Sequence, residues 1–187
     1  MNDILNEVLN WIKKSDKSVV IGVSGHGAAG KTTFSTKLAQ IIGLNEVSRI
    51  NTDPYIITSQ LRQYTTIQYR YQNKDYQSKM TACHPDAHHI VSLERDIRMI
   101  KSGLDFYTID TFYSKSELIS PRQITIIEGM SVTFIDPELI DLNIYFYTDD
   151  DTELRRRVGR DVLERGTDIN VLLESHKQRR IQYELFM

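Results

Sequence analysis

The sequence predicts an α/β fold in which a doubly wound parallel sheet of about four to five strands carries helices on both faces. Apolar runs with the length and β-branching of buried strands alternate along the chain with segments of helical periodicity. A glycine-rich turn joins the first run to its helix, and later runs end in acidic or amide side chains. The length of 187 residues is that of one such domain.

The stretch from Ser18 to Ile42 organises the rest of the chain. Its apolar run Val19 to Val23 predicts a strand buried on both faces. The helix that follows has an apolar stripe made of Phe34, Leu38, Ile41 and Ile42. Between strand and helix, GHGAAGKT from Gly25 to Thr32 fits G-x-x-x-x-G-K-[ST], the phosphate-binding P-loop. The predicted sheet is therefore of the P-loop NTPase type.

The loop predicts a nucleotide site that contains Mg²⁺. Its glycines let consecutive N–H groups turn toward a polyphosphate, and the helix that starts near Lys31 adds the positive end of its dipole. Lys31 would bridge the terminal phosphates, and the Thr32 hydroxyl would ligate the metal. The predicted nucleotide contacts are Gly25, His26, Gly27, Ala28, Ala29, Gly30, Lys31, Thr32 and Thr33. The alternative is a glycine-rich turn that binds nothing.

Two carboxylates follow predicted strands. Asp53 comes directly after the strand expected at 47–51, and Glu128 ends the one expected at 124–127. Ligands of an open parallel sheet bind beyond the carboxyl ends of its strands. Asp53 would take or orient the proton of a substrate hydroxyl, and Glu128 would bind Mg²⁺ through water. The alternatives are that Asp53 only caps the following helix and that Glu128 is structural.

A basic helix follows the strand predicted at 142–147. It starts at Thr152 after three aspartates and carries five arginines in eleven residues, namely Arg155, Arg156, Arg157, Arg160 and Arg165. We predict that segment 151–168 is a lid that closes over the transferring group and excludes water. The alternative is a solvated helix face whose arginines pair with Glu153, Asp161 and Glu164.

Other elements are predicted from periodicity and turn residues. Helices are expected over 2–14, 85–101 and 170–187, with a short strand or hairpin at 106–113. The inner positions of the last helix are predicted to include Val171, Leu172, His176, Ile181 and Leu185. Residues 55–80 lack apolar periodicity and contain several tyrosines. This stretch is either a solvated excursion or a substrate-facing region.

Composition excludes several classes of protein. A formal net charge of −2 gives no global electrostatic footprint for nucleic acid or an anionic membrane. The lone Cys83 permits no intramolecular disulfide and fits a reducing compartment. No apolar run reaches the length of a membrane span or has the pattern of a signal peptide. We therefore expect a soluble cytoplasmic protein.

Two further chemistries find little support. Cys83, His84, His88 and His89 cluster, but His84 precedes a proline and no second ligand pair lies at zinc-finger spacing. Ser24 and Ser131 have no evident base partner in the sequence, which argues against nucleophilic hydrolysis.

Five segments resemble the uridine kinase and phosphoribulokinase family of P-loop kinases. They are GHGAAGKTT at 25–33, TDPY at 52–55, CHPDA at 83–87, IIEGM at 126–130 and DTELRRRVGRDVLERGTD at 151–168. The resemblance implies a single kinase domain over 1–187, with a substrate-facing insert at about 54–116, that uses ATP and Mg²⁺ to phosphorylate a small-molecule hydroxyl.

The same resemblance assigns roles to residues. It implies a metal site formed by Thr32, Asp53 and Glu128, with Asp53 nearest the acceptor hydroxyl. The lid cations that it implies are Arg156, Arg157, Arg160 and Arg165. Of these, Arg157 and Arg160 would act with Asp53 and Lys31 in catalysis, and Arg156 and Arg165 would hold the nucleotide.

The chain departs from uridine kinases where those enzymes read the nucleoside. Cys83 stands in place of the aspartate that holds the ribose hydroxyls, and Thr167 replaces the arginine after E-R-G. The segment from Ile109 to Ser114 lacks the tyrosine, histidine and arginine of the pyrimidine-reading segment. The resemblance makes uridine or cytidine the first candidate acceptor, whereas these departures favour another hydroxylated metabolite. The alternatives are a sugar phosphate or pantothenate-like alcohol, or an ATP-binding regulatory protein without turnover.

The end of the chain also departs from the family. The family usually adds one more strand after the helix that here finishes at Met187. Either the sheet is one strand short, or the chain is truncated, or a partner subunit completes the edge. The resemblance is compatible with a homo-oligomer, although no apolar stripe requires one.

Overall fold

The computed structural model describes residues 1–164 and 166–187. The helices are α1 (Asn2–Ile12), α2 (Lys31–Ile42), α3 (Ser59–Arg62), α4 (Ile90–Lys101), α5 (Asp150–Arg157) and α6 (Ile169–Phe186). The strands are β1 (Val19–Gly25), β2 (Val47–Asn51), β3 (Thr66–Tyr71), β4 (Lys74–Lys79), β5 (Phe106–Tyr107), β6 (Leu118–Ile119), β7 (Ile124–Glu128) and β8 (Leu142–Phe146). In the described part of the chain, every helix is too short or too polar to cross a membrane.

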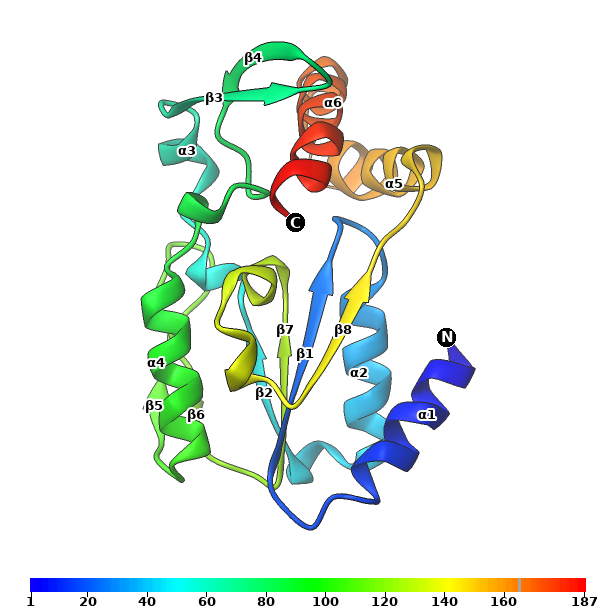
Figure 1. Cartoon of the computed structure of the whole chain (residues 1–187), viewed down its shortest axis with the longest axis vertical. Coiled ribbons are helices and arrows are strands. Elements are labelled where there is room, and N and C mark those ends of the chain that lie inside the picture. Colours follow the sequence, from blue (N-terminus) through cyan, green and yellow to red (C-terminus); the bar gives the residue numbers. More distant parts are fainter. Residues whose placement is uncertain (165) are drawn as a thin grey trace.

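The central sheet has four parallel strands in the order β2-β7-β1-β8. Helices α1 and α2 cover one face and α4 covers the other, while α5, α6 and the β3–β4 hairpin lie beyond the carboxyl ends of the strands (Figure 1). The fold class predicted from the sequence is confirmed. Because all four strands run the same way, their carboxyl ends share one edge of the sheet, and this edge faces α5 and α6.

Successive residues of the strands feed two separate cores. Val19, Ile21 and Val23 of β1 pack with residues of α1 and α2. Val20, one position along, packs on the opposite face with residues of α4. This alternation is the pleat of a strand whose two faces are both buried. Two apolar cores therefore hold the sheet in place below the site.

The helix expected at 85–101 begins later than predicted. A short 3₁₀ turn covers Pro85–Ala87, and α4 starts only at Ile90. Between them, His88 forms an isolated antiparallel β-bridge with Ile56. The His89 amide donates a hydrogen bond to the Tyr55 carbonyl at 2.8 Å. These long-range backbone hydrogen bonds keep His88 extended and His89 out of helical geometry, which interrupts the helix.

The stretch 55–80 is ordered into elements that periodicity did not predict. It contains α3 and an antiparallel hairpin, β3–β4, in which Tyr69 stacks on Tyr76. Both faces of the hairpin are largely polar, so no alternation of apolar residues marks the strands. A signal was present in Gln72-Asn73, which have φ angles of 48° and 62° and form the two-residue turn.

Three predictions of inner positions were wrong in part. Ile41 of α2 is 56% exposed and Val171 of α6 is 62% exposed. Leu172 and His176 of α6 are buried as predicted, but Gln182 and Tyr183 are buried where Leu185 was expected. α6 packs on polar groups of the P-loop and insert, so its buried face does not follow hydrophobicity. The short strand or hairpin expected at 106–113 is present as the two-residue β5, which pairs antiparallel with β6 outside the central sheet.

Candidate active site

The P-loop leaves the carboxyl end of β1 and curls around the start of α2. Gly25 has φ of 125°, and a Cβ atom there would lie 1.8 Å from the Phe146 carbonyl oxygen of β8. Ala28 and Gly30 also have positive φ values, of 55° and 100°, which turn successive N–H groups toward one concave side. Among residues 1–164 and 166–187, no side chain caps α2. The loop thus presents unpaired amides of a helix N-terminus, an arrangement that fits an anion such as a triphosphate.

Lys31 lies folded over the inner side of this loop. Its ammonium donates to the carbonyl oxygens of Gly25 at 3.1 Å and His26 at 2.7 Å, and the residue is only 8% exposed. Burial lowers the pKa of Lys31 to about 8, and the Glu128 carboxylate opposes this shift. A buried ammonium held by carbonyl groups alone is short of negative charge, which a phosphate group would supply.

Glu128 and Thr32 meet at the mouth of the loop. The Thr32 hydroxyl donates to Glu128 Oε1 at 3.2 Å. Burial raises the pKa of Glu128, and the Lys31 ammonium opposes the rise. After Glu128 the chain passes so close to Thr52 that a Cβ atom on Gly129 would lie 2.0 Å from Thr52 Oγ1. The ends of β7 and β2 are therefore held together by a position that only glycine fits.

Asp53 lies beside this pair with its carboxylate free. The side chain is exposed and, in the described part of the chain, makes no hydrogen bond, so it does not cap the turn that follows. Its backbone is fixed from both sides, because the Asp53 amide donates to Asn51 Oδ1 at 3.0 Å and its carbonyl accepts from the Tyr113 hydroxyl at 2.8 Å. Thr32, Asp53 and Glu128 offer only oxygen donors, the ligand chemistry that Mg²⁺ prefers.

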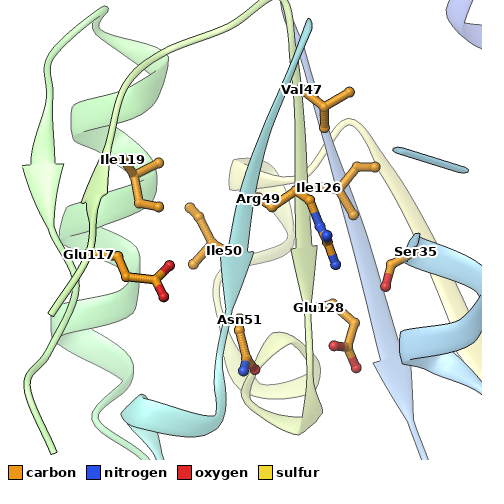
Figure 2. A pocket seen from close by; sticks show the side chains of 9 residues that line it. All are labelled: Ser35, Val47, Arg49, Ile50, Asn51, Glu117, Ile119, Ile126 and Glu128. Atoms are coloured by element: carbon orange, nitrogen blue, oxygen red, sulfur yellow. The ribbon is translucent and has the colours of Figure 1, made fainter. Parts of the chain in front are cut away.

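A cavity of about 450 Å³ lies behind Glu128 along the outer edge of β2. Figure 2 shows Arg49, Asn51 and Glu117 around it, with Glu128 at its inner end. The Arg49 guanidinium donates to Thr36 Oγ1 at 3.3 Å and is among the charges that favour ionised Glu128. The positive charge of Arg49 in this cavity therefore helps to keep Glu128 ionised.

One cleft of about 690 Å³ joins the P-loop to the carboxylates and to the helices above them. Its lining includes the loop from Gly27 to Thr33, together with Asp53 and Glu128. The cations that line it are Lys31, Arg62, Arg156, Arg160 and Arg179. Five basic side chains against two carboxylates leave an excess of positive charge, which fits a nucleotide polyphosphate.

A second cavity of about 410 Å³ opens from this cleft at Asp53. Asp53, Ile56, Arg62 and Ala82 line both spaces. On the side away from the cleft, the cavity of about 410 Å³ is lined by two aromatic residues, Phe112 and Tyr113. Asp53 therefore stands at the junction between a phosphate-binding cleft and a cavity of the size of a small organic molecule.

The arginines of the lid segment divide into two groups. Arg156 and Arg160 line the cleft, and Arg156 donates to the Ala28 carbonyl at 3.0 Å. Arg157 does not line it, because it is buried against Asp161 at 3.5 Å and His176 at 3.4 Å. Arg160 also donates to Asp161, at 2.7 Å, so the predicted ion pairing holds for part of the helix. Arg165 lies outside the described residues.

Two residues that line the cleft, Arg62 and Arg179, and one that contacts its P-loop, Tyr183, were missed in the sequence. Arg62 belongs to α3, and Arg179 and Tyr183 belong to α6. The Gly27 amide donates to the Tyr183 hydroxyl at 2.9 Å. The only hint of this contact was the polar surface of α6, since a helix with buried tyrosine and glutamine needs a polar surface to pack on.

One histidine of the cluster has a structural role, and it overturns a prediction about Ser131. Ser131 was expected to lack a base partner, yet His88 Nδ1 lies 2.8 Å from its hydroxyl. Both side chains are buried, and burial lowers the pKa of His88 to about 4. The pair joins Ala82 to the end of β7, because His88 Nε2 also contacts the Ala82 carbonyl at 2.9 Å. The described residues contain no cluster suited to hold a metal through histidine and cysteine.

Comparison with known proteins identifies relatives of this site. The sequence model described as "Phosphoribulokinase / Uridine kinase family" matches residues 20–187, which bears out the resemblance. The chain is 27% identical over 176 residues to a uridine kinase of Ligilactobacillus salivarius, covering 88% of this chain and 76% of that protein. It is 30% identical over 171 residues to a uridine kinase of Lactobacillus helveticus, covering 87% and 77%.

Among solved structures, the fold is similar to that of a putative fructose transport system kinase from Silicibacter sp. TM1040. The TM-score is 0.65 at 16% identity, and the match covers 94% of this chain and 87% of that one. At this identity the likeness concerns the fold alone.

Proposed function

This chain belongs to the phosphoribulokinase / uridine kinase family, and we propose that it transfers the γ-phosphoryl group of MgATP to a hydroxyl of a small molecule, with uridine or cytidine as first candidates. The observation that carries this proposal is the single cleft that joins the P-loop, the Thr32–Glu128 pair and Asp53. A protein that only binds nucleotide has no need of a free carboxylate between the phosphate cleft and a second cavity. We also propose a cytoplasmic location, where MgATP is available.

In the proposed reaction, Lys31 and the loop amides hold the phosphates of ATP. Thr32, Glu128 and Asp53 would hold Mg²⁺, which neutralises charge on the phosphate oxygens when bound. Asp53 accepts the proton of the acceptor hydroxyl while the hydroxyl oxygen bonds to the γ-phosphorus. The bond from the γ-phosphorus to the bridging oxygen breaks, and ADP leaves. Arg156 and Arg160, which lie above the loop, exclude water and stabilise the charge on the transferring group.

The second cavity supplies the acceptor side of the proposal. Phe112 is 76% exposed and Tyr113 is 49% exposed, so both offer ring surface to a planar base. Cys83 is fully buried and lines neither cavity, so a ribose would need other partners such as Thr58 and Ser59.

The position and hydrogen-bond partners of Arg62 favour an alternative acceptor. It lines both cavities, and its hydrogen bonds go to the carbonyls of Ile57 and Met80 rather than to a carboxylate. A sugar phosphate or a pantothenate-like carboxylate would supply the missing negative charge. A regulatory protein without turnover remains a third alternative.

The test is ADP release from MgATP with a panel of acceptors. Uridine and cytidine are compared with ribulose 5-phosphate, pantothenate and neutral polyols. Lys31→Ala is the inactive reference, and Lys37→Ala is its matched control, since Lys37 is exposed on the same helix. Stimulation by one acceptor class supports transfer and names the substrate. If ATP binds but no acceptor raises ADP release above the Lys31→Ala level, transfer to these acceptors is refuted and the regulatory alternative gains.

A further inference from the structure

We propose that Arg179 of α6 contacts the transferring phosphoryl group and is a further catalytic residue of this site. The inference rests on the proposed function, because it names a contact to the group that is transferred. Neither the family motifs nor the lid segment contains Arg179. It comes from the helix after the lid, which Figure 1 shows lying above the carboxyl ends of the strands.

Arg179 reaches the P-loop directly. It lines the nucleotide cleft, and its Nη2 atom lies 3.0 Å from where a Cβ atom on Gly27 would be. The Lys31 ammonium lines the same cleft. Two cations that face the same loop repel each other unless an anion lies between them. A P-loop lysine reaches the β- and γ-phosphates, and in the proposal the γ-phosphate is the group that would lie between the two cations.

Arg179 also differs from its neighbours in its partners. Arg180 pairs with Asp150 at 3.4 Å and Glu153 at 3.2 Å, and Arg157 and Arg160 pair with Asp161. Arg179, by contrast, donates only to neutral atoms within the described chain, namely the Tyr183 hydroxyl at 3.0 Å and the Met130 sulfur at 3.4 Å. A guanidinium that makes few hydrogen bonds in a partly buried site keeps donors available for a ligand.

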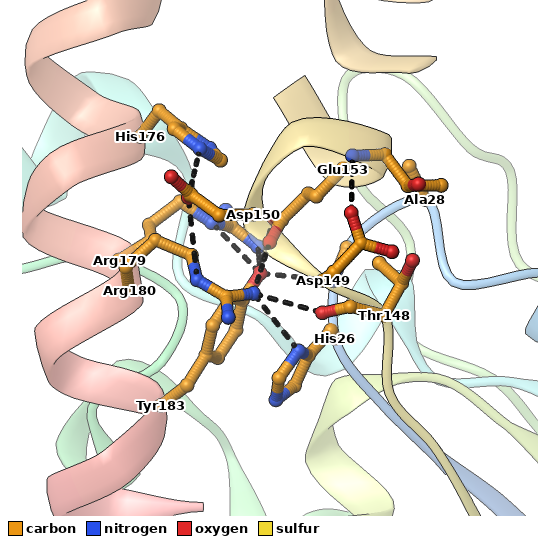
Figure 3. A network of polar contacts seen from close by, with 12 residues as sticks. His26, Ala28, Thr148, Asp149, Asp150, Glu153, His176, Arg179, Arg180 and Tyr183 are labelled. Atoms are coloured by element: carbon orange, nitrogen blue, oxygen red, sulfur yellow. Dashed lines mark hydrogen bonds and ion pairs between the residues drawn. The ribbon is translucent and has the colours of Figure 1, made fainter. Parts of the chain in front are cut away.

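Tyr183 positions this guanidinium. Its hydroxyl accepts from Arg179 Nε at 3.2 Å and from the Gly27 amide at 2.9 Å, and it donates to Glu153 at 2.8 Å. Its ring stacks on His26 with centroids 4.0 Å apart (Figure 3). Glu153 is fully buried and also accepts from Arg180. The network ties α5, α6 and the P-loop into one unit, so Arg179 is held in place before a nucleotide arrives.

The experiment compares two nucleotides that differ only at the γ-position. Binding of ADP and of the β,γ-imido analogue of ATP, each with Mg²⁺, is measured by calorimetry without acceptor. The variants are Arg179→Gln, Arg179→Lys and Tyr183→Phe, with Lys177→Gln as the matched control on the exposed side of α6. Turnover is measured in parallel. Thermal unfolding of each variant checks that it folds. If Arg179→Gln does not fold, Arg179→Lys takes its place in the comparison.

Arg179→Gln is expected to weaken the analogue by about ten- to a hundredfold and ADP by less than about threefold. Arg179→Lys should recover part of the loss, and Tyr183→Phe should show a smaller loss with the same preference. Equal losses for both nucleotides would mean a structural role and would overturn the proposal, as would unchanged binding of the analogue. If the wild-type protein binds neither nucleotide, and its binding data do not differ from those of Lys31→Ala, the proposed function itself is refuted.

Discussion

The two walls of the cleft differ in how the chain builds them. The loop wall is one run of residues, 27–33, which joins β1 to the start of α2. The facing wall consists of single side chains from segments far apart in the sequence, namely Arg62, Arg156, Arg160 and Arg179. Strand pairing and backbone geometry hold the first wall. The second depends on side-chain hydrogen bonds, each worth only about 1 kcal/mol.

This difference separates a rigid phosphate cradle from a facing wall in which some cations, such as Arg156, are only loosely held. Gly25 is fixed against β8, so the loop keeps its shape without ligand. Arg156 is exposed and is held to the loop by one hydrogen bond to Ala28. We therefore expect changes at the fixed carboxylates to affect chemistry strongly and changes on the facing wall to act more weakly.

The largest effect is expected at Asp53. Asp53→Asn removes the proposed proton acceptor without changing shape, so turnover should fall by about 10²–10⁴ with nucleotide affinity nearly unchanged. Asp105→Asn is the matched control, because Asp105 is exposed and far from the cleft lining. Steady-state kinetics with saturating MgATP measure the loss. Retention of more than a tenth of the activity would mean that the proton leaves by another route.

Glu128 should control the metal requirement. Glu128→Gln is expected to raise the Mg²⁺ concentration for half-maximal activity by about ten- to a hundredfold, since a charged oxygen ligand becomes neutral. Glu117→Gln is the matched control, because Glu117 lines only the cavity behind Glu128. A Mg²⁺ titration at fixed ATP tests this. An unchanged Mg²⁺ dependence would leave Glu128 with a structural role.

The buried lysine predicts a pH dependence of nucleotide binding. Burial lowers the pKa of Lys31 to about 8, so the ammonium is charged below that pH and loses its proton above it. Affinity for Mg-ADP should be constant from pH 7 toward 8 and then fall by up to about tenfold per pH unit. Lys31→Arg should flatten this profile, because arginine stays charged. An identical decline in both proteins would assign the titration to another group.

The two adjacent lid arginines offer the smallest but sharpest test. Arg156→Gln should lower turnover by about tenfold without changing thermal stability, because Arg156 is exposed and lines the cleft. Arg157→Gln should leave turnover per folded molecule within twofold and reduce the free energy of unfolding by about 1–3 kcal/mol, because it removes buried hydrogen bonds. Denaturant unfolding and kinetics of both variants decide this. Loss of turnover in Arg157→Gln at unchanged stability would support the motif-based assignment instead.

The main strands along the chain and the loop wall were predictable because their signals are local. A buried strand, a glycine loop and a helix follow one another directly, and Asp53 and Glu128 end strands whose apolar runs are visible in the sequence. The β3–β4 hairpin was not predicted, because tyrosines and polar residues alternate there without an apolar face. The delayed start of α4 depends on a hydrogen bond from His89 to Tyr55, which no local pattern marks.

Family membership, the loop and the two carboxylates at strand ends therefore follow from residues that are neighbours in the chain. Which arginines face the cleft does not. Arg156 and Arg157 are adjacent, yet one lines the cleft and the other is buried against His176. Arg179 meets Gly27 although they lie far apart in the sequence, because α6 crosses the carboxyl edge of the sheet. Side-chain direction on a helix is set by what the helix packs against, and that is decided only when distant segments assemble.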